Sequence, residues 1–198
     1  MSQPTSDPAD ERDLIARARA GDESAFAQLV TEHSARVYGA LRRFGLDPQE
    51  ADEVAQEVFL RAWRGLARFE ERSQFSTWLY RIAFNEAQRR LARRPRATAF
   101  SHPGDEDAIA ALPDAVGAGP QAQTLDREFE QVLERALDEL PADLRAAVVL
   151  RDLEGLSTEE AAAVAGVRQA AFKSRLHRGR MQLRALLEPY LQLEQASA

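Results

Sequence analysis

The sequence contains no cysteine, which excludes disulfides, thiolate metal sites and thiol catalysis. It has no apolar run long enough to span a bilayer, so no membrane insertion is expected. The first twelve residues, MSQPTSDPADER, lack the basic start and apolar stretch of a signal peptide, and we therefore expect a cytoplasmic protein. The three histidines, His33, His102 and His177, are far apart and show no ligand spacing. We accordingly expect neither a metal nor another cofactor.

Strand patterns and enzymatic motifs are also missing. No segment alternates apolar and polar positions with β-branched residues, so no sheet is expected and the fold class should be all-α. We find no glycine-rich phosphate loop and no nucleophile–base arrangement. The sequence therefore favours a binding protein over an enzyme.

Charge is unevenly distributed along the chain. The net charge of -6 argues mildly against a nucleic-acid partner when the chain is taken as a whole. Two segments have the opposite balance: residues 61–96 carry ten arginines against three glutamates, and residues 168–184 carry six basic residues and no acidic one. These two segments are the candidates for contact with phosphate.

The chain divides into two halves around residues 95–123, a stretch with four prolines, three glycines and no sustained periodicity. We expect two small helical domains joined by this flexible linker. The expected boundaries are a disordered tail at 1–9, a first domain at 10–94, a second domain at 124–190 and a short tail at 191–198.

Capping signals locate the helices of the first domain. A short helix is expected over Leu14–Ala20, and Asp22 should cap a second helix that Gly45 ends. The run Asp47-Pro48-Gln49-Glu50 has the form of a capping box and should open the third helix. After a loop at 67–75, Ser76 is expected to cap a fourth helix that extends to Arg94.

The fourth helix has an unusual outer face. At 100° per residue, one side carries Trp78, Ile82, Asn85 and Arg89, while the nearly opposite side is apolar. Such an aromatic and basic strip could stack unpaired bases and neutralise their backbone. The alternative is a core helix whose far end emerges into water, and this segment alone does not decide between the two.

The second domain ends in a helix-turn-helix pattern. Two helices, at about 125–139 and 142–153, precede a capping-box signature from Ser157 to Glu160. A short alanine-rich helix then meets Gly166, and a longer helix follows to about Leu187. Small residues in the short helix allow a second helix to cross it closely.

The faces of the last helix can be assigned from its periodicity. Its expected inner face is Phe172, Leu176, Gly179, Leu183 and Leu186. Its outer face is small, polar and basic, and it consists of Ala170, Ser174, His177, Arg178 and Met181. Lys173, Arg175 and Arg180 flank this face. A solvated face normally mixes both signs of charge, whereas this one has no acid, and it therefore suits a DNA major groove.

These residues resemble a known family. Glu139-Leu140-Pro141, Leu153 to Ser157, Glu160-Ala161-Ala162 and Lys173 to Arg178 are similar to region four of the bacterial extracytoplasmic-function (ECF) sigma factors. Asp52 to Trp63, together with Phe75, Trp78 to Ala83 and Asn85, resembles region two of the same family. The two matches occur in the family's order on either side of the linker, which makes the pair highly specific.

The resemblance implies a dissociable subunit that directs core RNA polymerase to promoter DNA, helps to open it, and is regulated by an anti-sigma factor. It implies polymerase binding by Asp52, Gln56, Glu57 and Arg61. It implies contacts to the minus-ten element, with an extruded base held by the loop at 67–75, from Phe75, Trp78, Arg81, Asn85 and Arg89. It implies contacts to the minus-thirty-five element from Arg168, Ala171, Lys173, Ser174, His177 and Arg178.

The sequence departs from the family pattern at the start of the last helix. Ala171 stands where a threonine is usual, so the phosphate contact and cap of that hydroxyl are missing, and Phe172 is bulkier than the usual residue. Phe84 replaces a polar or basic residue, which would move some region-two contacts onto Arg81 or Arg89. We expect altered promoter preference. The main alternative is a helix-turn-helix regulator that binds DNA without core polymerase.

Overall fold

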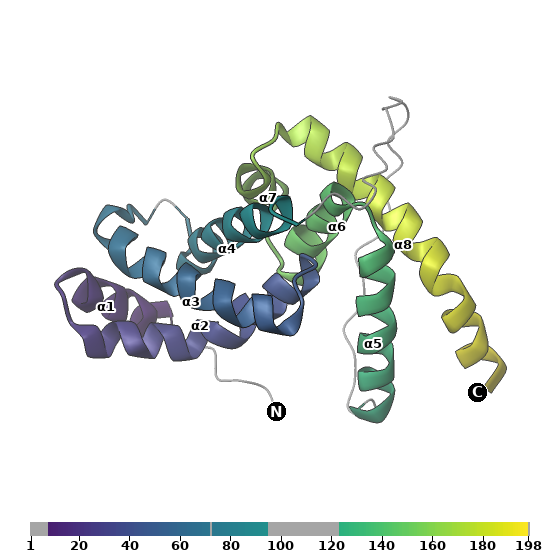
Figure 1. The fold of residues 1–198 in the computed structure, drawn as a ribbon, viewed down its shortest axis with the longest axis horizontal. Coiled ribbons are helices and arrows are strands. Elements are labelled where there is room, and N and C mark those ends of the chain that lie inside the picture. The colour runs from purple at the N-terminus through teal and green to yellow at the C-terminus, as the bar shows by residue number, and fades with distance from the viewer. Residues whose placement is uncertain (1–7, 72, 95–122, 198) are drawn as a thin grey trace. The chain divides into compact units, whose positions relative to one another are not determined.

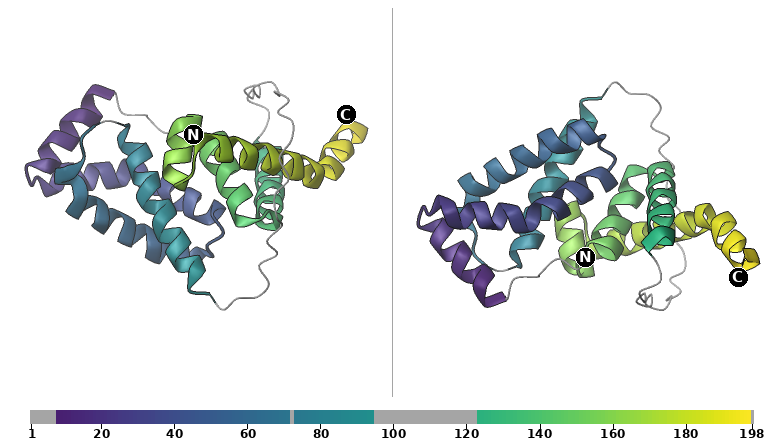
Figure 2. Two further views of the ribbon diagram at one scale, coloured as in Figure 1. Left: turned by 90° about the horizontal axis from the view of Figure 1, so that it is seen from above. Right: turned by 90° about the horizontal axis from the view of Figure 1, so that it is seen from below.

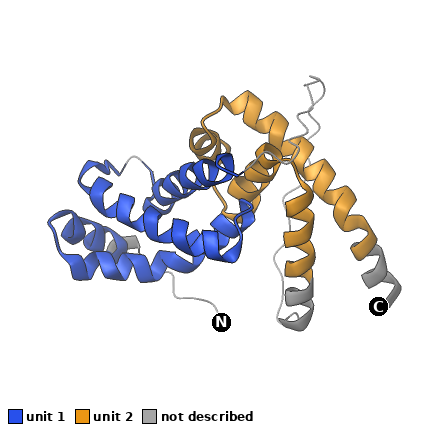
Figure 3. Cartoon of the chain, in the orientation of Figure 1, with its two compact units in different colours: residues 1–94 blue, residues 95–198 orange. Residues whose placement is uncertain are grey.

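The computed structural model describes residues 8–71, 73–94 and 123–197, and every regular element in these ranges is a helix (Figure 1). The chain forms two compact units, residues 1–94 and 95–198 (Figure 3). The predicted all-α class is confirmed. No helix in the described ranges combines the length and apolarity that crossing a membrane requires. The proposed linker, apart from residue 123, lies outside the described residues.

Unit 1 contains four α-helices whose path can be followed from two further sides in Figure 2. They are α1 (Pro8–Arg19), α2 (Glu23–Arg43), α3 (Pro48–Gly65) and α4 (Phe75–Ala92), with a 3₁₀ turn, η1 (Leu66–Arg68), after α3. Helix α2 contacts each of the other three. Their shared core is apolar, and its largest fully buried members are Phe75, Leu29, Leu41, Leu46, Leu66 and Leu79.

The predicted caps of α2 and α3 are present. Asp22 accepts hydrogen bonds from the backbone amides of Ser24 and Ala25, at 2.9 and 3.1 Å. Asp47 accepts from the amide of Glu50 at 2.8 Å, and the Glu50 carboxylate accepts from the amide of Asp47 at 3.3 Å, which completes the capping box. These caps satisfy amides that have no partner inside the helix.

Two predicted helix starts in unit 1 were wrong. Helix α1 begins at Pro8, ahead of the expected Leu14, and so takes in part of the expected tail; proline suits a first helical turn, and Asp10 and Glu11 favour the positive end of the helix dipole. Helix α4 begins at Phe75 and its N-cap is Gln74, with no side-chain cap. Ser76 therefore lies inside the helix, because the buried Phe75 ring fixes the start.

Unit 2 consists of α5 (Gln123–Glu139), α6 (Ala142–Val148), a π-helical turn η2 (Val149–Leu153), α7 (Thr158–Ala165) and α8 (Gln169–Ser197). The expected single helix at 142–153 is thus a helix followed by a π segment, in which the amide of Glu154 donates to the carbonyl of Val149 at 2.9 Å. Helix α8 continues to Ser197 through Pro189, so the expected tail at 191–198 is helical as far as residue 197.

Helices α7 and α8 form the helix-turn-helix. The predicted capping box joins Ser157 and Glu160, and α7 ends at Gly166, whose φ of 68° lies in the left-handed region that glycine adopts without strain. Phe172 is fully buried and Leu176 nearly so, which confirms the predicted orientation of α8. Helix α8 packs against α6, α7 and α5.

Candidate nucleic-acid interface

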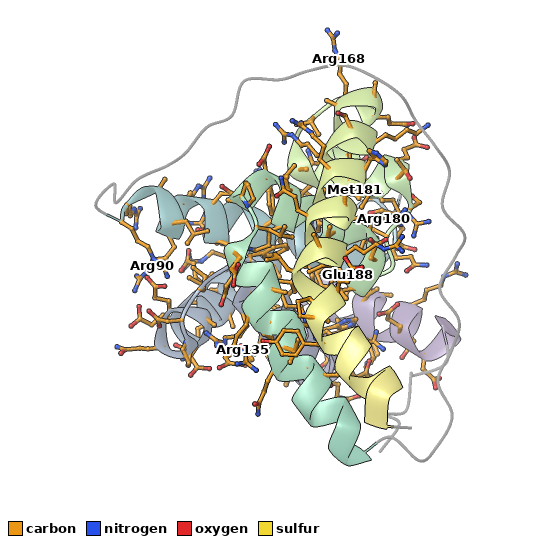
Figure 4. All side chains as sticks on the ribbon, turned by 90° about the vertical axis from the view of Figure 1, so that its right-hand side faces the viewer. Arg90, Arg135, Arg168, Arg180, Met181 and Glu188 are labelled. Atoms are coloured by element: carbon orange, nitrogen blue, oxygen red, sulfur yellow. The ribbon has the colours of Figure 1, made fainter. Side chains whose placement is uncertain are left out.

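The outer face of α8 is exposed as expected. Ser174 and Arg178 are exposed, His177 is half-buried and Met181 is 50% exposed. Arg168 and Lys173 are also exposed, and Arg168 extends beyond the first turn of α8 in Figure 4. No acidic partner of Arg168, Lys173 or Arg178 occurs within the described part of the chain. These three cations are therefore available to phosphates or base edges.

Two other cations of α8 are held by acids from elsewhere in unit 2, which the sequence reading did not anticipate. Arg180 donates two hydrogen bonds to Asp152, from Nε at 2.9 Å and from Nη2 at 2.6 Å. Arg175 lies 3.5 Å from a carboxylate oxygen of Asp143. The expectation that Arg175 and Arg180 flank the groove face as free phosphate ligands is corrected by these pairs.

Helix α4 has an exposed polar strip beside a buried apolar face. Arg81, Asn85 and Arg89 are exposed and Trp78 is half-buried, so four of the five residues expected at the minus-ten element reach the surface. Phe84 is buried, with its ring centroid 5.4 Å from that of Phe44. The apolar residue at this position is thus explained by packing in the core.

Phe75 is the exception among these candidates. It is only 2% exposed and lies within an aromatic cluster, with ring centroids 5.2 to 5.7 Å from those of His33, Phe69 and Trp78. This burial does not favour a direct contact from Phe75 to DNA, and that contact stays a prediction. The ring supports Trp78, which also packs closely over Gly65.

The loop before α4 is linked to the end of α1 by an ion pair. Glu71 has a φ of 54°, an uncommon backbone conformation for a residue other than glycine. Its carboxylate accepts a hydrogen bond from Arg19, at the end of α1, at 3.2 Å. The loop is therefore held both by this ion pair and by the buried ring of Phe69.

A groove of about 940 Å³ lies between α2 and α3. Its walls are largely aromatic and aliphatic, with Glu23, Asp52 and Gln56 at polar positions: Phe26, Val30, Tyr38, Phe59, Leu60 and Trp63. Leu60 is 50% exposed, which is high for a large apolar side chain. Two of the four residues expected to bind polymerase, Asp52 and Gln56, thus belong to an apolar groove that the sequence reading missed.

The other two expected polymerase residues belong to an ion-pair network. The Nε atom of Arg61 lies 2.7 Å from a Glu57 oxygen and 3.1 Å from an oxygen of Glu86 in α4. The same Glu86 oxygen accepts a hydrogen bond from Arg89 at 2.6 Å. One carboxylate therefore joins the expected polymerase surface to the expected minus-ten strip.

A second ion-pair network joins the start of α3 to the end of α4. Glu50 accepts hydrogen bonds from both Arg90 and Arg94, and Arg90 also donates to Glu53 at 2.9 Å. The hydrogen bond from Arg94, then that from Arg90, lowers the pKa of Glu50 to about 2 against the opposing effect of its burial. Much of the positive charge at the end of α4 is therefore balanced within unit 1.

Comparison with known proteins identifies both units. The Sigma-70 region 2 model matches residues 29–97, and the Sigma-70 region 4 model matches residues 130–183. The RNA polymerase sigma-H factor of Pseudomonas aeruginosa is 38% identical over 186 residues, covering 91% of this chain and 95% of that protein. The chain belongs to the ECF sigma factors. The ECF RNA polymerase sigma-E factor of Escherichia coli is 35% identical over 184 residues, covering 90% and 94%.

Solved structures agree with this assignment. CnrH in complex with the cytosolic domain of CnrY is 31% identical, with a TM-score of 0.63, and the match covers 91% of this sigma factor and 98% of that chain. The sigma factor RpoE of Bartonella quintana, in complex with the anti-sigma factor NepR, is 27% identical, with a TM-score of 0.61, and the match covers 82% and 96%.

Family membership decides between the functions left open by the sequence. This protein is an RNA polymerase sigma factor that directs promoter recognition, and the alternative of a regulator acting without core polymerase is set aside. Sigma factors are transcription initiation factors and not enzymes. The residues that carry each contact in this sigma factor are inferred below.

Proposed function

We propose that α8 of this sigma factor reads the minus-thirty-five element as duplex DNA. The observation that carries this assignment is the separation of the cations of α8 into two sets. Arg168, Lys173 and Arg178 are exposed and unpaired within the described residues, and Ser174 and His177 lie between them. Residues at the front of a recognition helix reach base edges, while flanking cations contact phosphates. Ala171, exposed on the first turn, would meet DNA with a methyl group.

The exposed strip of α4 is assigned to the opened minus-ten strand. Trp78 offers part of an aromatic face for stacking, and Asn85 offers both donors and acceptors for a base edge. Arg81 and Arg89 would neutralise the backbone of the strand. The loop before α4, fastened by Glu71 to Arg19, would receive an extruded base.

The groove between α2 and α3 is assigned to core polymerase. Its exposed apolar wall, with Leu60 at the surface, suits the apolar side of a partner helix, and Asp52 and Gln56 provide a polar rim. Glu57 and Arg61 extend this surface along α3. The partner would be the clamp coiled coil of the largest polymerase subunit, as the family resemblance implies.

An anti-sigma factor is proposed as a second protein partner. CnrH and the Bartonella RpoE were each solved with a second protein, and NepR is described as an anti-sigma factor. A partner that covers the α2–α3 groove would compete directly with core polymerase. A sigma factor acts together with core polymerase on promoter DNA. We therefore place this sigma factor in the cytoplasm.

Substitutions on two surfaces test the α8 and groove assignments in one system. Holoenzyme containing Lys173→Ala or Arg178→Ala should bind promoter duplex roughly 5- to 100-fold more weakly, with core binding unchanged. Leu60→Asp, at an exposed position of the groove, should weaken core binding and leave the fold intact. A Leu60→Asp variant that binds core polymerase as tightly as the native chain would rule out the groove. If holoenzymes with either α8 substitution bind the promoter duplex as tightly as native holoenzyme, the α8 assignment is ruled out.

A further inference from the structure

We propose that Asp152 and Arg180 act as a positioning pair that fixes the orientation of α8 in the DNA groove. This inference rests on the proposed reading of the minus-thirty-five element by α8. Arg180 is not a free phosphate ligand, because two hydrogen bonds tie its guanidinium to one carboxylate, 28 residues earlier in the chain. The two side chains are 38% and 26% exposed, so the pair lies at the edge of the unit and outside its apolar core.

The pair lies next to the point where α8 crosses α6. A Cβ atom added at Gly179 would lie only 2.8 Å from Val148 Cγ2 and 3.0 Å from the Leu144 carbonyl oxygen. The glycine therefore lets the two helices touch, and the buried Phe172 and Leu176 hold the same face of α8 against the rest of unit 2. Arg180 is the next residue and projects about 100° further round α8. Its bond to Asp152 adds a directional contact at the edge of this packing, and we assign to it the final orientation of α8 about its own axis.

Asp152 is itself placed by an irregular feature of the backbone. It lies in η2, the π turn that follows α6. A π turn contains more residues than an α turn, so the side chains after it are displaced around the axis relative to a regular helix. The carboxylate that binds Arg180 therefore lies within this irregular turn and not in a regular α-helix.

The geometry of the pair distinguishes positioning from phosphate binding. A guanidinium that makes two parallel hydrogen bonds to a carboxylate fixes direction as well as distance, and a lysine ammonium cannot reproduce this fork. A phosphate ligand, in contrast, tolerates lysine, because the contact there needs mainly charge. Arg180→Lys therefore separates the two roles without a change in net charge.

The test uses holoenzyme made from the full chain and core polymerase. Its probes are a promoter duplex selected by the native holoenzyme from a randomised library and the same duplex with the minus-thirty-five block scrambled. Arg180→Ala, Arg180→Lys and Asp152→Ala should each weaken binding to the selected duplex about ten-fold. Binding to the scrambled duplex should change less than about two-fold, so the ratio of the two affinities falls. The exchanged pair, Asp152→Arg with Arg180→Asp, should restore that ratio.

A matched control is Arg184→Ala. Arg184 is exposed one turn further along α8, and no acidic partner for it occurs in the described ranges. This change should leave the selected-to-scrambled ratio unaltered.

Two results would overturn the positioning pair. One is an equal loss of affinity for both duplexes in Arg180→Ala, with native behaviour in Arg180→Lys and Asp152→Ala; this is the behaviour of a phosphate ligand. The other is an exchanged pair that folds, by circular dichroism, yet stays at the level of the single variants. If the native holoenzyme binds the two duplexes equally well, the minus-thirty-five assignment itself fails. The proposal that the pair positions α8 is then rejected as well.

Discussion

Single residues set the contacts between helices in this sigma factor. At Gly179 the absence of a side chain allows α8 to approach the backbone of α6, where even a methyl group would meet the Leu144 carbonyl oxygen. Gly39, in the middle of α2, is in a different situation, since an added Cβ would meet only the flexible end of Arg43, 3.3 Å away. The two glycines therefore provide a matched comparison.

Gly179→Ala should destabilise unit 2, because the gain in helix propensity is smaller than the cost of overpacking against a backbone atom. We expect a net loss of about 1–2 kcal/mol in the free energy of unfolding. Gly39→Ala should be neutral or stabilising by up to about 1 kcal/mol, because Arg43 can move. Urea unfolding followed by far-ultraviolet circular dichroism measures both. A Gly179→Ala variant as stable as the native chain would contradict the tight crossing.

Glu50 should make the stability of unit 1 depend on acid. Its pKa in the folded chain is about 2, below the ordinary value of 4.5, because Arg94 and Arg90 hydrogen-bond to the charged form. The stabilisation is therefore complete above about pH 4.5 and is lost as the pH falls towards 2. Glu50→Gln should flatten the stability profile in this window. Tryptophan fluorescence is a specific probe, since Trp63 and Trp78, the chain's two tryptophans, both lie in unit 1. An unchanged acid dependence would contradict the ion-pair network.

At the scale of elements, helix α4 belongs to two proposed surfaces at once. Its Glu86 holds Arg89 of the minus-ten strip and Arg61 of the polymerase surface, and the carboxylate is only 11% exposed. Charge on α4 is therefore partly balanced before any nucleic acid binds. This balance limits how strongly the strip attracts a single strand.

Glu86→Gln should increase the affinity of the holoenzyme for single-stranded minus-ten DNA by about two- to five-fold. The reason is that Arg89, itself 57% exposed, loses its ionic partner, which is worth about 0.5–1 kcal/mol for a pair with one exposed member. Fluorescence anisotropy with a labelled non-template strand measures the change, and a steeper salt dependence should accompany it. Unchanged or weaker binding would indicate that Glu86 serves only to join α3 and α4.

Helix starts with local caps were predictable, whereas those fixed by packing were not. Asp22, Asp47 and Ser157 bond to amides two or three residues away, so their roles can be read from a short window of sequence. Phe75 begins α4 because its ring is buried against residues of other elements, and this overrode the local signal at Ser76.

The faces of the proposed site were also predictable from helical periodicity, but its electrostatics were not. The outer side of α8 was assigned correctly, since exposure follows the 3.6-residue repeat. The partners of Arg175 and Arg180 are Asp143 and Asp152, which are distant in sequence. Long-range pairs of this kind leave no local pattern, and the α2–α3 groove was missed for the same reason.

At the scale of the whole molecule, an acidic chain carries two proposed DNA-binding faces on separate units. The net charge of -6 opposes non-specific attraction to DNA, and each face alone offers few unpaired cations. Tight binding should therefore require both units to engage one promoter while core polymerase holds them.

Deleting about ten residues between 96 and 121 should weaken promoters with widely spaced elements more than it weakens core binding, because the connecting segment limits the reach of the two units. Transcription from templates with varied spacing, compared with core affinity, measures this. Equal loss of both activities would argue against a spacing role for the segment.

The most direct test of the account is transcription in a purified system. Core RNA polymerase, which lacks promoter specificity in this assay, is combined with the purified chain and templates selected by the resulting holoenzyme. We predict transcripts that begin at defined promoters only when the chain is present. These transcripts should be lost with Leu60→Asp and should decrease in amount with Arg178→Ala. A chain that binds promoter DNA but never directs core polymerase to initiate would contradict the account.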